Sequence, residues 1–189
     1  MRKSRQEAAQ TRQRIVEAAS WEFRCKGIGD TGLADIMAAA GLTHGGFYKH
    51  FDSKDQVVEE SLTLAIDGVV GTVEATLSAH SGKKAMNTVV ADYLSVEHRD
   101  DPSGGCPFVG LGIELSRSSD SVRDVATAGF KKLIDTLASS YAEMTSAAAK
   151  KEAMVTLSTI IGAATLARIV NDEALSTTLL QQARLSLTQ

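Results

Sequence analysis

Residues 31–54 read TGLADIMAAAGLTHGGFYKHFDSK, and this stretch decides the fold. From Leu33 to Ala40, apolar residues recur at three- and four-residue spacing, which predicts a short amphipathic helix. Gly41 is placed to end that helix in the left-handed conformation, and Leu42 is the apolar residue that follows such a cap. The stretch therefore predicts two helices joined by a glycine-containing turn.

The second helix of the pair is expected to begin at Thr43, whose hydroxyl can accept a hydrogen bond from an early backbone amide. Phe47 and Phe51 lie four residues apart and predict the inward face of this helix. The outward side chains are then His44, Tyr48, Lys49 and His50. Two helices joined in this way meet at a steep angle, and the second can enter a DNA major groove. Such pairs also occur as plain packing units.

The match to a known family extends beyond this pair. Residues 12–19 read RQRIVEAA and residues 39–43 read AAGLT, and further matching residues are Phe23, Lys26, Gly27, Thr31, Asp35, Ile36, Gly45, Phe47, Tyr48, Phe51, Ser53 and Lys54. Together they resemble the DNA-binding domain of the TetR family of transcriptional regulators. The resemblance implies an all-α protein in which residues 1–53 form a three-helix DNA-binding domain with a helix-turn-helix. Residues 54–189 would form a larger helical ligand-binding and dimerisation domain.

The resemblance also implies which residues meet double-stranded operator DNA. They are Thr31, Gly32, Thr43, His44, Gly45, Gly46, Tyr48, Lys49, His50 and Lys54. Three of them depart from the family pattern, which commonly has Lys or Arg at His44, Ser or Thr at Gly46, and Ser or Thr at Gly32. Ser53 is the expected N-cap of the next helix, and Lys54 follows it. The Lys54 side chain could contact a phosphate beside the exposed amides of that helix start, or it could simply be solvated.

Composition supports a helical protein. The chain has 189 residues, of which 43% are hydrophobic and only two are proline. No period-two strand pattern competes with helical patterns at about 8–26, 53–79, 82–98, 106–117, 120–147, 150–169 and 173–187, so about nine helices are expected. The loop at 99–105, RDDPSGG, is the clearest break.

The N-terminal sequence and the cysteines indicate the compartment of the protein and whether it binds a metal or cofactor. The start, MRKSRQEAAQTRQR, is basic and lacks the apolar core of a signal peptide, and no stretch of eighteen uninterrupted apolar residues follows. A cytoplasmic protein with no membrane association is therefore expected. The two cysteines, Cys25 and Cys106, lack a metal-binding spacing, so neither a metal nor a cofactor is expected.

Charge is distributed unevenly, although the net charge of the chain is −3. Residues 1–56 contain nine Lys and Arg against seven Asp and Glu, whereas the remainder is acidic. The first fourteen residues carry Arg2, Lys3, Arg5, Arg12 and Arg14 against Glu7. Such a basic arm can neutralise phosphates without reading sequence, or it can be a solvated terminus.

The last two helical patterns suggest a subunit interface. Apolar residues recur there beside the small run at 162–164, GAA, which allows close helix approach, and in the family two such helices from each subunit form a four-helix dimer interface. The residues expected at a homodimer interface are Leu157, Ile160, Ile161, Ala164, Leu175 and Leu179. An internal core would explain the same residues.

Two kinds of effector are considered. Cys106 lies at an expected helix start, where amides and the helix dipole can stabilise a thiolate that reacts with electrophiles, or it is a small buried hydrophobe. Alternatively, a small apolar or aromatic molecule would lie between the middle helices. With Cys106, the expected lining is Tyr93, Phe108, Leu111, Glu114, Phe130 and Tyr141, all of which core packing or solvent exposure could also explain.

The leading interpretation is a repressor that binds a palindromic operator as a homodimer and is released by a small-molecule or thiol-reactive effector. One alternative is a thiol-dependent enzyme with Cys106 as nucleophile and His98 or Asp100 as its partner. Another is a DNA-architectural protein, against which the acidic body argues. The sequence lacks a nucleotide-binding loop, a metal-ligand set and a nucleophile motif, so an enzyme is not expected.

Overall fold

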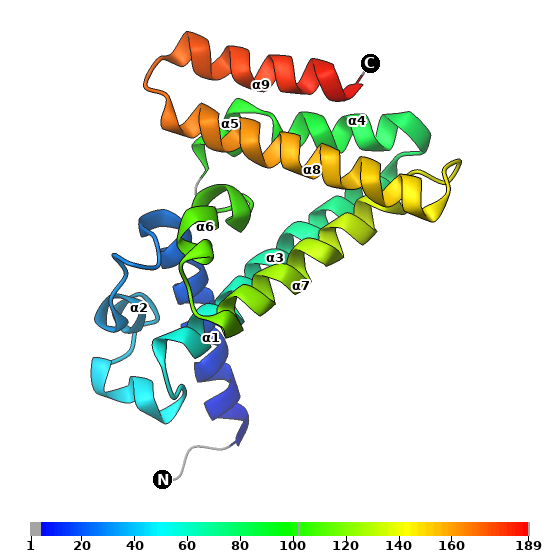
Figure 1. The fold of residues 1–189 in the computed structure, drawn as a ribbon. Coiled ribbons are helices and arrows are strands. Elements are labelled where there is room, and N and C mark those ends of the chain that lie inside the picture. The colour runs from blue at the N-terminus through cyan, green and yellow to red at the C-terminus, as the bar shows by residue number, and fades with distance from the viewer. Residues whose placement is uncertain (1–4, 102, 189) are drawn as a thin grey trace.

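The computed structural model describes residues 5–101 and 103–188, which form an entirely helical fold, as expected (Figure 1). The elements in chain order are α1 (Arg5–Lys26), α2 (Leu33–Ala39), the 3₁₀-helix η1 (His44–Lys49), α3 (Lys54–Ala79), α4 (Gly82–Tyr93), α5 (Val96–Asp100), α6 (Pro107–Ser116), α7 (Asp120–Ala138), α8 (Ser146–Ile169) and α9 (Glu173–Thr188). No strand occurs in the described ranges.

The helices form two groups joined by α3. Helices α1 and α2 and the short η1 gather at one end, while α8 and α9 lie side by side at the other (Figure 1). Helix α3 packs most extensively against α7 and α1, so one continuous helix belongs to both groups. Helix α6 contacts α1, α3, α7 and α8 and thus lies where the groups meet.

Helix α3 begins as its sequence predicts. The hydroxyl oxygen of Ser53 accepts a hydrogen bond from the Gln56 amide at 3.1 Å. The Gln56 side chain in turn accepts a hydrogen bond from the Asp52 amide at 2.8 Å. Both contacts satisfy donors at the start of the helix that no helical carbonyl can reach.

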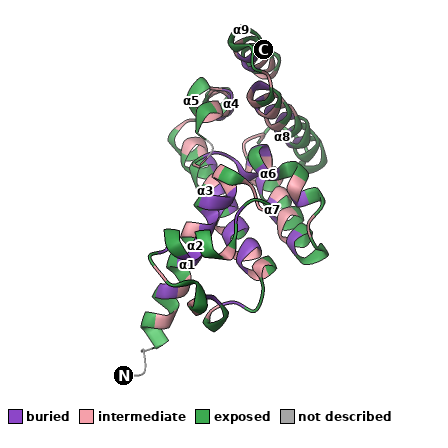
Figure 2. Ribbon diagram, turned by 90° about the vertical axis from the view of Figure 1, so that its left-hand side faces the viewer, coloured by how far each residue is buried: buried purple, intermediate pink, exposed green. Residues whose placement is uncertain are grey.

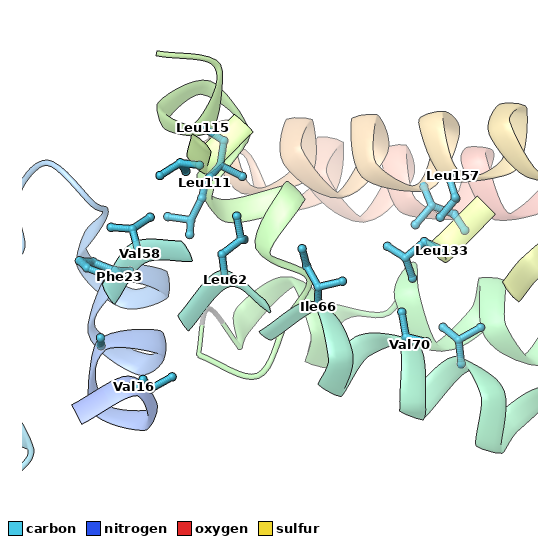
Figure 3. Packing of buried hydrophobic residues seen from close by; sticks show 14 of the residues in the cluster. Val16, Phe23, Val58, Leu62, Ile66, Val70, Leu111, Leu115, Leu133 and Leu157 are labelled. Atoms are coloured by element: carbon cyan, nitrogen blue, oxygen red, sulfur yellow. The ribbon is translucent and has the colours of Figure 1, made fainter. Parts of the chain in front are cut away.

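The apolar stripe of α3 supplies the centre of one continuous core (Figure 3). Val58 and Leu62 meet Phe23 of α1 and Leu111 of α6, and farther along the helix Ile66 and Val70 approach Leu133 of α7. The view coloured by burial shows the buried residues on the inward faces of the helices (Figure 2). Helices α3 and α8 are also long and apolar enough to cross a membrane by length and composition alone, a property that core helices share.

Three helix boundaries differ from the expected ones. The pattern at 82–98 is broken after Tyr93, because Leu94 leaves helical geometry and Ser95 caps a new helix by accepting a hydrogen bond from the His98 amide at 3.1 Å. The pattern at 120–147 ends at Ala138, and Thr145 caps α8. These hydroxyl caps compete with helix continuation in a segment whose other residues favour helix.

We expect Gly129→Ala to destabilise the fold. A Cβ atom on Gly129 of α7 would overlap the buried Ile66 of α3, whose Cγ2 atom would lie 2.9 Å away. Overpacking of this kind costs about 1–3 kcal/mol of unfolding free energy, which urea denaturation would measure.

Gly71→Ala is the matched control. Gly71 lies in α3, and a Cβ atom there meets no atom within 4 Å. Replacing a mid-helix glycine with alanine should stabilise the fold by about 0.5–1 kcal/mol. Equal effects of the two substitutions would show that α3 and α7 are not packed as closely as described.

Candidate functional site

The turn between α2 and η1 has the predicted glycine cap. Gly41 has φ of +67°, in the left-handed region. Its amide donates to the Ala38 carbonyl at 2.9 Å, and the Leu42 amide donates to the Met37 carbonyl at 2.8 Å. This pair of hydrogen bonds is the Schellman motif, which closes the last carbonyls of a helix and turns the chain sharply.

The second helix of the pair is the six-residue 3₁₀-helix η1. Phe47 and Phe51 are 0% and 2% exposed, which confirms the predicted inward face, and their rings stack at 5.4 Å between centroids. Thr43 is the N-cap residue, but its side chain makes no capping hydrogen bond, so that prediction is wrong. Two glycines in the first turn reduce helical stability, which suits a short and tightly wound element.

The outward face of η1 is exposed. Tyr48 is 67% exposed, and Thr43, His44, Gly45 and Lys49 are also exposed. Gly46 and His50 are half-buried at the edge of the same surface, and Gly32 lies exposed at the start of α2. We refer to these eight residues as the η1 surface.

Two of the ten predicted DNA contacts lie outside this surface. Thr31 is 0% exposed, and its hydroxyl donates to the Gly27 carbonyl at 2.6 Å, so it holds the α1–α2 connection together instead of facing solvent. The Lys54 ammonium group donates to the Ile28 carbonyl and lies 5.9 Å from the centre of the Phe23 ring. Lys54 therefore ties the start of α3 to the same connection.

Two arginines of the basic arm also have internal partners. Arg12 forms an ion pair with Glu60 of α3, and its guanidinium lies 4.0 Å from the centre of the Phe51 ring. Arg14 donates to the Ala40 carbonyl at the end of α2. Both side chains thus hold α1 against its neighbours, while Arg2 and Lys3 lie outside the described residues. The arm contributes fewer available cations than its sequence suggests.

A cavity of about 410 Å³ lies between α1, α3, the end of α4 and the segment before α6. Its lining includes Trp21 of α1, Val69 of α3, Tyr93 of α4, His98 of α5 and Cys106. Of the predicted ligand-binding residues, the structure brings only Tyr93 and Cys106 to this cavity. It also differs from the predicted location, because α1 forms one of its walls.

The other predicted lining residues have structural roles elsewhere. Phe108 and Phe130 form an edge-to-face pair at 5.5 Å, and Leu111 is 5% exposed in the core. Tyr141 lies at a separate cavity, where its hydroxyl is 3.3 Å from that of Thr156. These aromatic residues therefore belong to helix packing and not to one shared pocket.

Glu114 is half-buried and does not line this cavity. Its carboxylate accepts a hydrogen bond from the Gly29 amide at 2.7 Å. This contact joins α6 to the turn between α1 and α2, and Arg24 of α1 makes a second link by donating to the Gly105 carbonyl at 3.5 Å. The segment around α6 is thus attached directly to the helices that carry the η1 surface.

The environment of Cys106 favours the thiol. Cys106 is 2% exposed, and burial raises its pKa despite the opposing effects of the Phe108 amide, the Tyr93 hydroxyl and the Val109 amide. The expectation that the helix start stabilises a thiolate is therefore wrong, because desolvation outweighs the amides. His98 accepts from the Cys106 amide at 3.3 Å, and Asp100 pairs with Arg99. Neither side chain is positioned to activate the sulfur as a nucleophile. Within the described ranges, no three His, Cys, Asp or Glu residues are grouped to hold a metal ion.

Two family models match most of the chain. Residues 15–61 match the bacterial regulatory proteins of the tetR family, and residues 83–181 match the C-terminal domain of LmrA/YxaF-like transcriptional regulators. The chain belongs to the TetR family of transcriptional regulators.

Curated relatives match over shorter stretches. The HTH-type transcriptional regulator TtgR of Pseudomonas putida is 42% identical over 62 residues, which is 33% of this chain and 30% of TtgR. The HTH-type transcriptional repressor DhaR of a Mycobacterium species is 30% identical over 112 residues, covering 59% of this chain and 56% of DhaR. The matched region thus spans between about a third and a little over half of these relatives.

Solved structures extend the likeness to the whole fold. A TetR transcriptional regulator from Chloroflexus aurantiacus superimposes with a TM-score of 0.79 at 26% identity, covering 97% of this chain and 94% of that one. The reduced form of Escherichia coli NemR gives a TM-score of 0.81 at 19% identity, with coverage of 94% and 95%. At that identity, NemR shows the fold alone.

The expected dimer residues of this TetR-family chain divide into two sets. Leu157, Ile160 and Ala164 are 3%, 1% and 0% exposed, so they pack inside the subunit and are corrected here to core positions. Ile161 and Leu179 are half-buried, and Leu175 is 47% exposed. Periodicity located the apolar positions of α8 but not the side of the helix that faces its own subunit.

A different stripe of α8 and α9 is exposed. It contains apolar residues that are 47–70% exposed, and we refer to them as the α8–α9 face: Val155, Leu166, Ile169, Leu175 and Leu185. Exposed apolar residues that gather on neighbouring helices are candidates for an interaction surface.

Sequence reasoning also missed Trp21 and Arg24 as cavity residues. Both lie on α1, which the sequence assigned wholly to the helix-turn-helix unit. The available signal was Trp21 itself, because it is 49% exposed and stands outside the buried stripe of α1 that contains Ile15, Ala19 and Phe23. A large aromatic side chain outside the stripe indicates a second surface on the helix.

We expect Gly41→Ala to weaken the helix-turn-helix. A non-glycine residue in the left-handed region costs about 1–2 kcal/mol, and the new Cβ atom would lie 3.2 Å from Nη2 of Arg14. Thermal denaturation should report this loss. Gly45→Ala is the control because a Cβ atom there meets nothing within 4 Å. A loss in Gly45→Ala that matches the loss in Gly41→Ala would contradict the assigned turn.

Proposed function

We propose that this protein is a transcriptional regulator that binds a palindromic operator as a homodimer, acts as a repressor in the cytoplasm, and is released from DNA by a small-molecule effector. The observation that carries the proposal is the η1 surface, an exposed face held by the Gly41 turn and by buried Phe47 and Phe51. Membership of the TetR family supports the same function.

The η1 surface has the chemistry to meet DNA. Tyr48 and Lys49 offer a hydroxyl and an ammonium group to phosphates, and Thr43 and His44 offer hydrogen-bonding groups to base edges or phosphates. Gly45 and Gly46 carry no side chain, so they allow close approach of a phosphate or a thymine methyl group. Phosphate contacts would position the short helix, and base contacts would provide the specificity.

The α8–α9 face supports the homodimer. A two-fold axis through this face would present two η1 surfaces to successive major grooves, which is the arrangement that reads a palindrome. An effector lowers DNA affinity only if it binds one state of the dimer more tightly than the other. The state that it prefers must be the one whose η1 surfaces no longer match the two half-sites.

The other candidate functions have weaker support. A thiol-reactive effector or a thiol-dependent enzyme would need a reactive Cys106, whereas burial raises the pKa of that thiol and favours its protonated form. An architectural DNA-binding protein would bind unrelated duplexes equally, whereas the η1 surface is small and the body of the chain is acidic. A small molecule is therefore the effector that we propose.

The direct test is fluorescence-anisotropy binding to DNA from upstream of the protein's own gene, with a scrambled duplex at the same salt concentration. Tyr48→Phe should weaken operator binding about fivefold if the hydroxyl contacts a phosphate, since a hydrogen bond to a charged group is worth about 1 kcal/mol or more. Tyr141→Phe, remote from the η1 surface, should leave the affinity unchanged. Equal binding to both duplexes by the parent protein would contradict the proposed function.

The homodimer can be tested separately with a protein that carries both Leu166→Glu and Ile169→Glu. Two unpaired carboxylates would have to be buried, so the dimer should weaken on the order of a hundredfold or more. Light scattering after size-exclusion chromatography should then report a monomer. Ile113→Glu changes a residue that is 68% exposed on α6 and should not affect assembly. A double variant that stays dimeric would place the interface elsewhere.

A further inference from the structure

The carboxylate of Glu114 fits closely against the turn between α1 and α2. One of its oxygens, Oε2, accepts the hydrogen bond from the Gly29 amide at 2.7 Å. The other oxygen, Oε1, lies 2.7 Å from the position that a Cβ atom on Gly27 would occupy. Gly27 has φ of +90°, a conformation that favours glycine. The same glycine therefore allows the turn and leaves space for the carboxylate.

Other contacts of this turn come from the turn itself and from the start of α3. The Thr31 hydroxyl donates to the Gly27 carbonyl at 2.6 Å, and the Lys54 ammonium group donates to the Ile28 carbonyl. These contacts hold the shape of the turn without any help from α6. Glu114 instead joins the turn to α6, which lies where the two groups of helices meet. Its loss would leave the turn folded and remove one attachment to the rest of the subunit.

This attachment differs in kind from the apolar contacts beside it. Leu111 and Leu115 of α6 belong to the same core as Phe23 of α1 and lie close to it (Figure 3). Apolar packing is non-directional, so it resists separation of the helices more than it resists a small rotation. A hydrogen bond weakens steeply when its angle departs from linear. The contact of Glu114 with Gly29 therefore fixes the angle at which the turn meets α6.

The angle of this turn matters for the η1 surface. Gly32, which belongs to that surface, follows Gly29 by three residues and precedes α2. A dimer must place two η1 surfaces on two half-sites at once, so their separation depends on how each helix-turn-helix is angled on its own subunit. One base pair of spacer moves a half-site by about 3.4 Å and rotates it by about 35°. A small rotation at the turn is enough to change which spacing fits.

We propose that Glu114 is a positioning residue for DNA recognition. Through its hydrogen bond to the Gly29 amide, it sets the angle of the helix-turn-helix and thereby selects the spacing between the operator half-sites. The inference rests on the proposed function, since only a dimer on a palindrome has a spacing to select. Glu114 lies outside the η1 surface, so binding to a single half-site does not depend on it.

Operator duplexes with altered spacers test this role in the intact protein. The operator identified upstream of the protein's own gene is compared with duplexes whose central spacer is one base pair longer or shorter, and with a single half-site, by fluorescence anisotropy. The parent protein should prefer its own spacing by about tenfold or more. Glu114→Ala should weaken binding at that spacing about tenfold and reduce the preference to about threefold or less. Its affinity for the half-site should stay within about twofold of the parent value.

Two further variants separate the hydrogen bond from charge and general stability. Glu114→Gln keeps an oxygen that can accept from the Gly29 amide, and it should restore most of the spacing preference. Glu143→Ala removes the same charge from an exposed position between α7 and α8 and should change neither affinity nor preference. Hydrogen exchange at the Gly29 amide should be faster in Glu114→Ala than in the parent, Glu114→Gln or Glu143→Ala.

The possible results distinguish the positioning role from the regulator itself. Selective operator binding with an unchanged spacing preference in Glu114→Ala would overturn the role of Glu114 and leave the regulator intact. Equal losses of affinity for the half-site and the full operator would also overturn it, because Glu114 would then serve only the stability of the fold. A parent protein that binds no duplex selectively would contradict the proposed function, and the role of Glu114 with it.

Discussion

The continuity of α3 is the constraint on which the rest of the structure depends. Its first turns pack against α1 and support the helix-turn-helix, and its later turns pack against α7. A single α-helix of 26 residues is about 39 Å long and does not bend easily between its ends. The two groups of helices therefore share one rigid element and one hydrophobic core, so that neither group can move without repacking against α3.

Local chemistry in the sequence was sufficient to predict the helix-turn-helix. The Gly41 cap, the inward Phe47 and Phe51 and the Ser53 cap depend on neighbours within a few residues, and all were predicted correctly. Lys54 was harder because its partner, the Ile28 carbonyl, lies 26 residues earlier in the chain, and Thr31 because its hydroxyl turns inward to the Gly27 carbonyl. A polar side chain beside a functional motif can serve DNA or the local scaffold, and only the fold distinguishes these roles.

The positions of the cavity and of the exposed apolar face could be determined only from the tertiary structure. Period-3.6 patterns identify which residues are apolar but not which neighbour they meet, and α8 has both a buried stripe and an exposed one. The middle helices supplied the expected aromatic residues, yet Phe108 and Phe130 pack on each other while the open volume lies against α1. A cavity at a junction between groups of helices cannot be predicted when each group is considered separately.

The cavity occupies a particular position relative to the rest of the molecule. Helix α1 lies on one side of it, and α5 lies on the other, attached to α8 through Arg168. Contacts of Glu114 with Gly29 and of Arg24 with Gly105 run alongside it. The volume thus adjoins the helix that supports the η1 surface and the short helix that is attached to α8.

The internal partners of Arg12 and Arg14 have a further consequence, which concerns ions in solution. Affinity for a duplex falls with salt in proportion to the number of phosphates that protein cations neutralise, because each neutralised phosphate releases condensed counterions. The Arg12 guanidinium is already paired with the Glu60 carboxylate and brings no uncompensated charge to a duplex, whereas Arg14, bound to the neutral Ala40 carbonyl, keeps its charge. A count of basic residues in the first fourteen positions therefore overestimates how steeply the ionic strength of the cell controls occupancy of the operator.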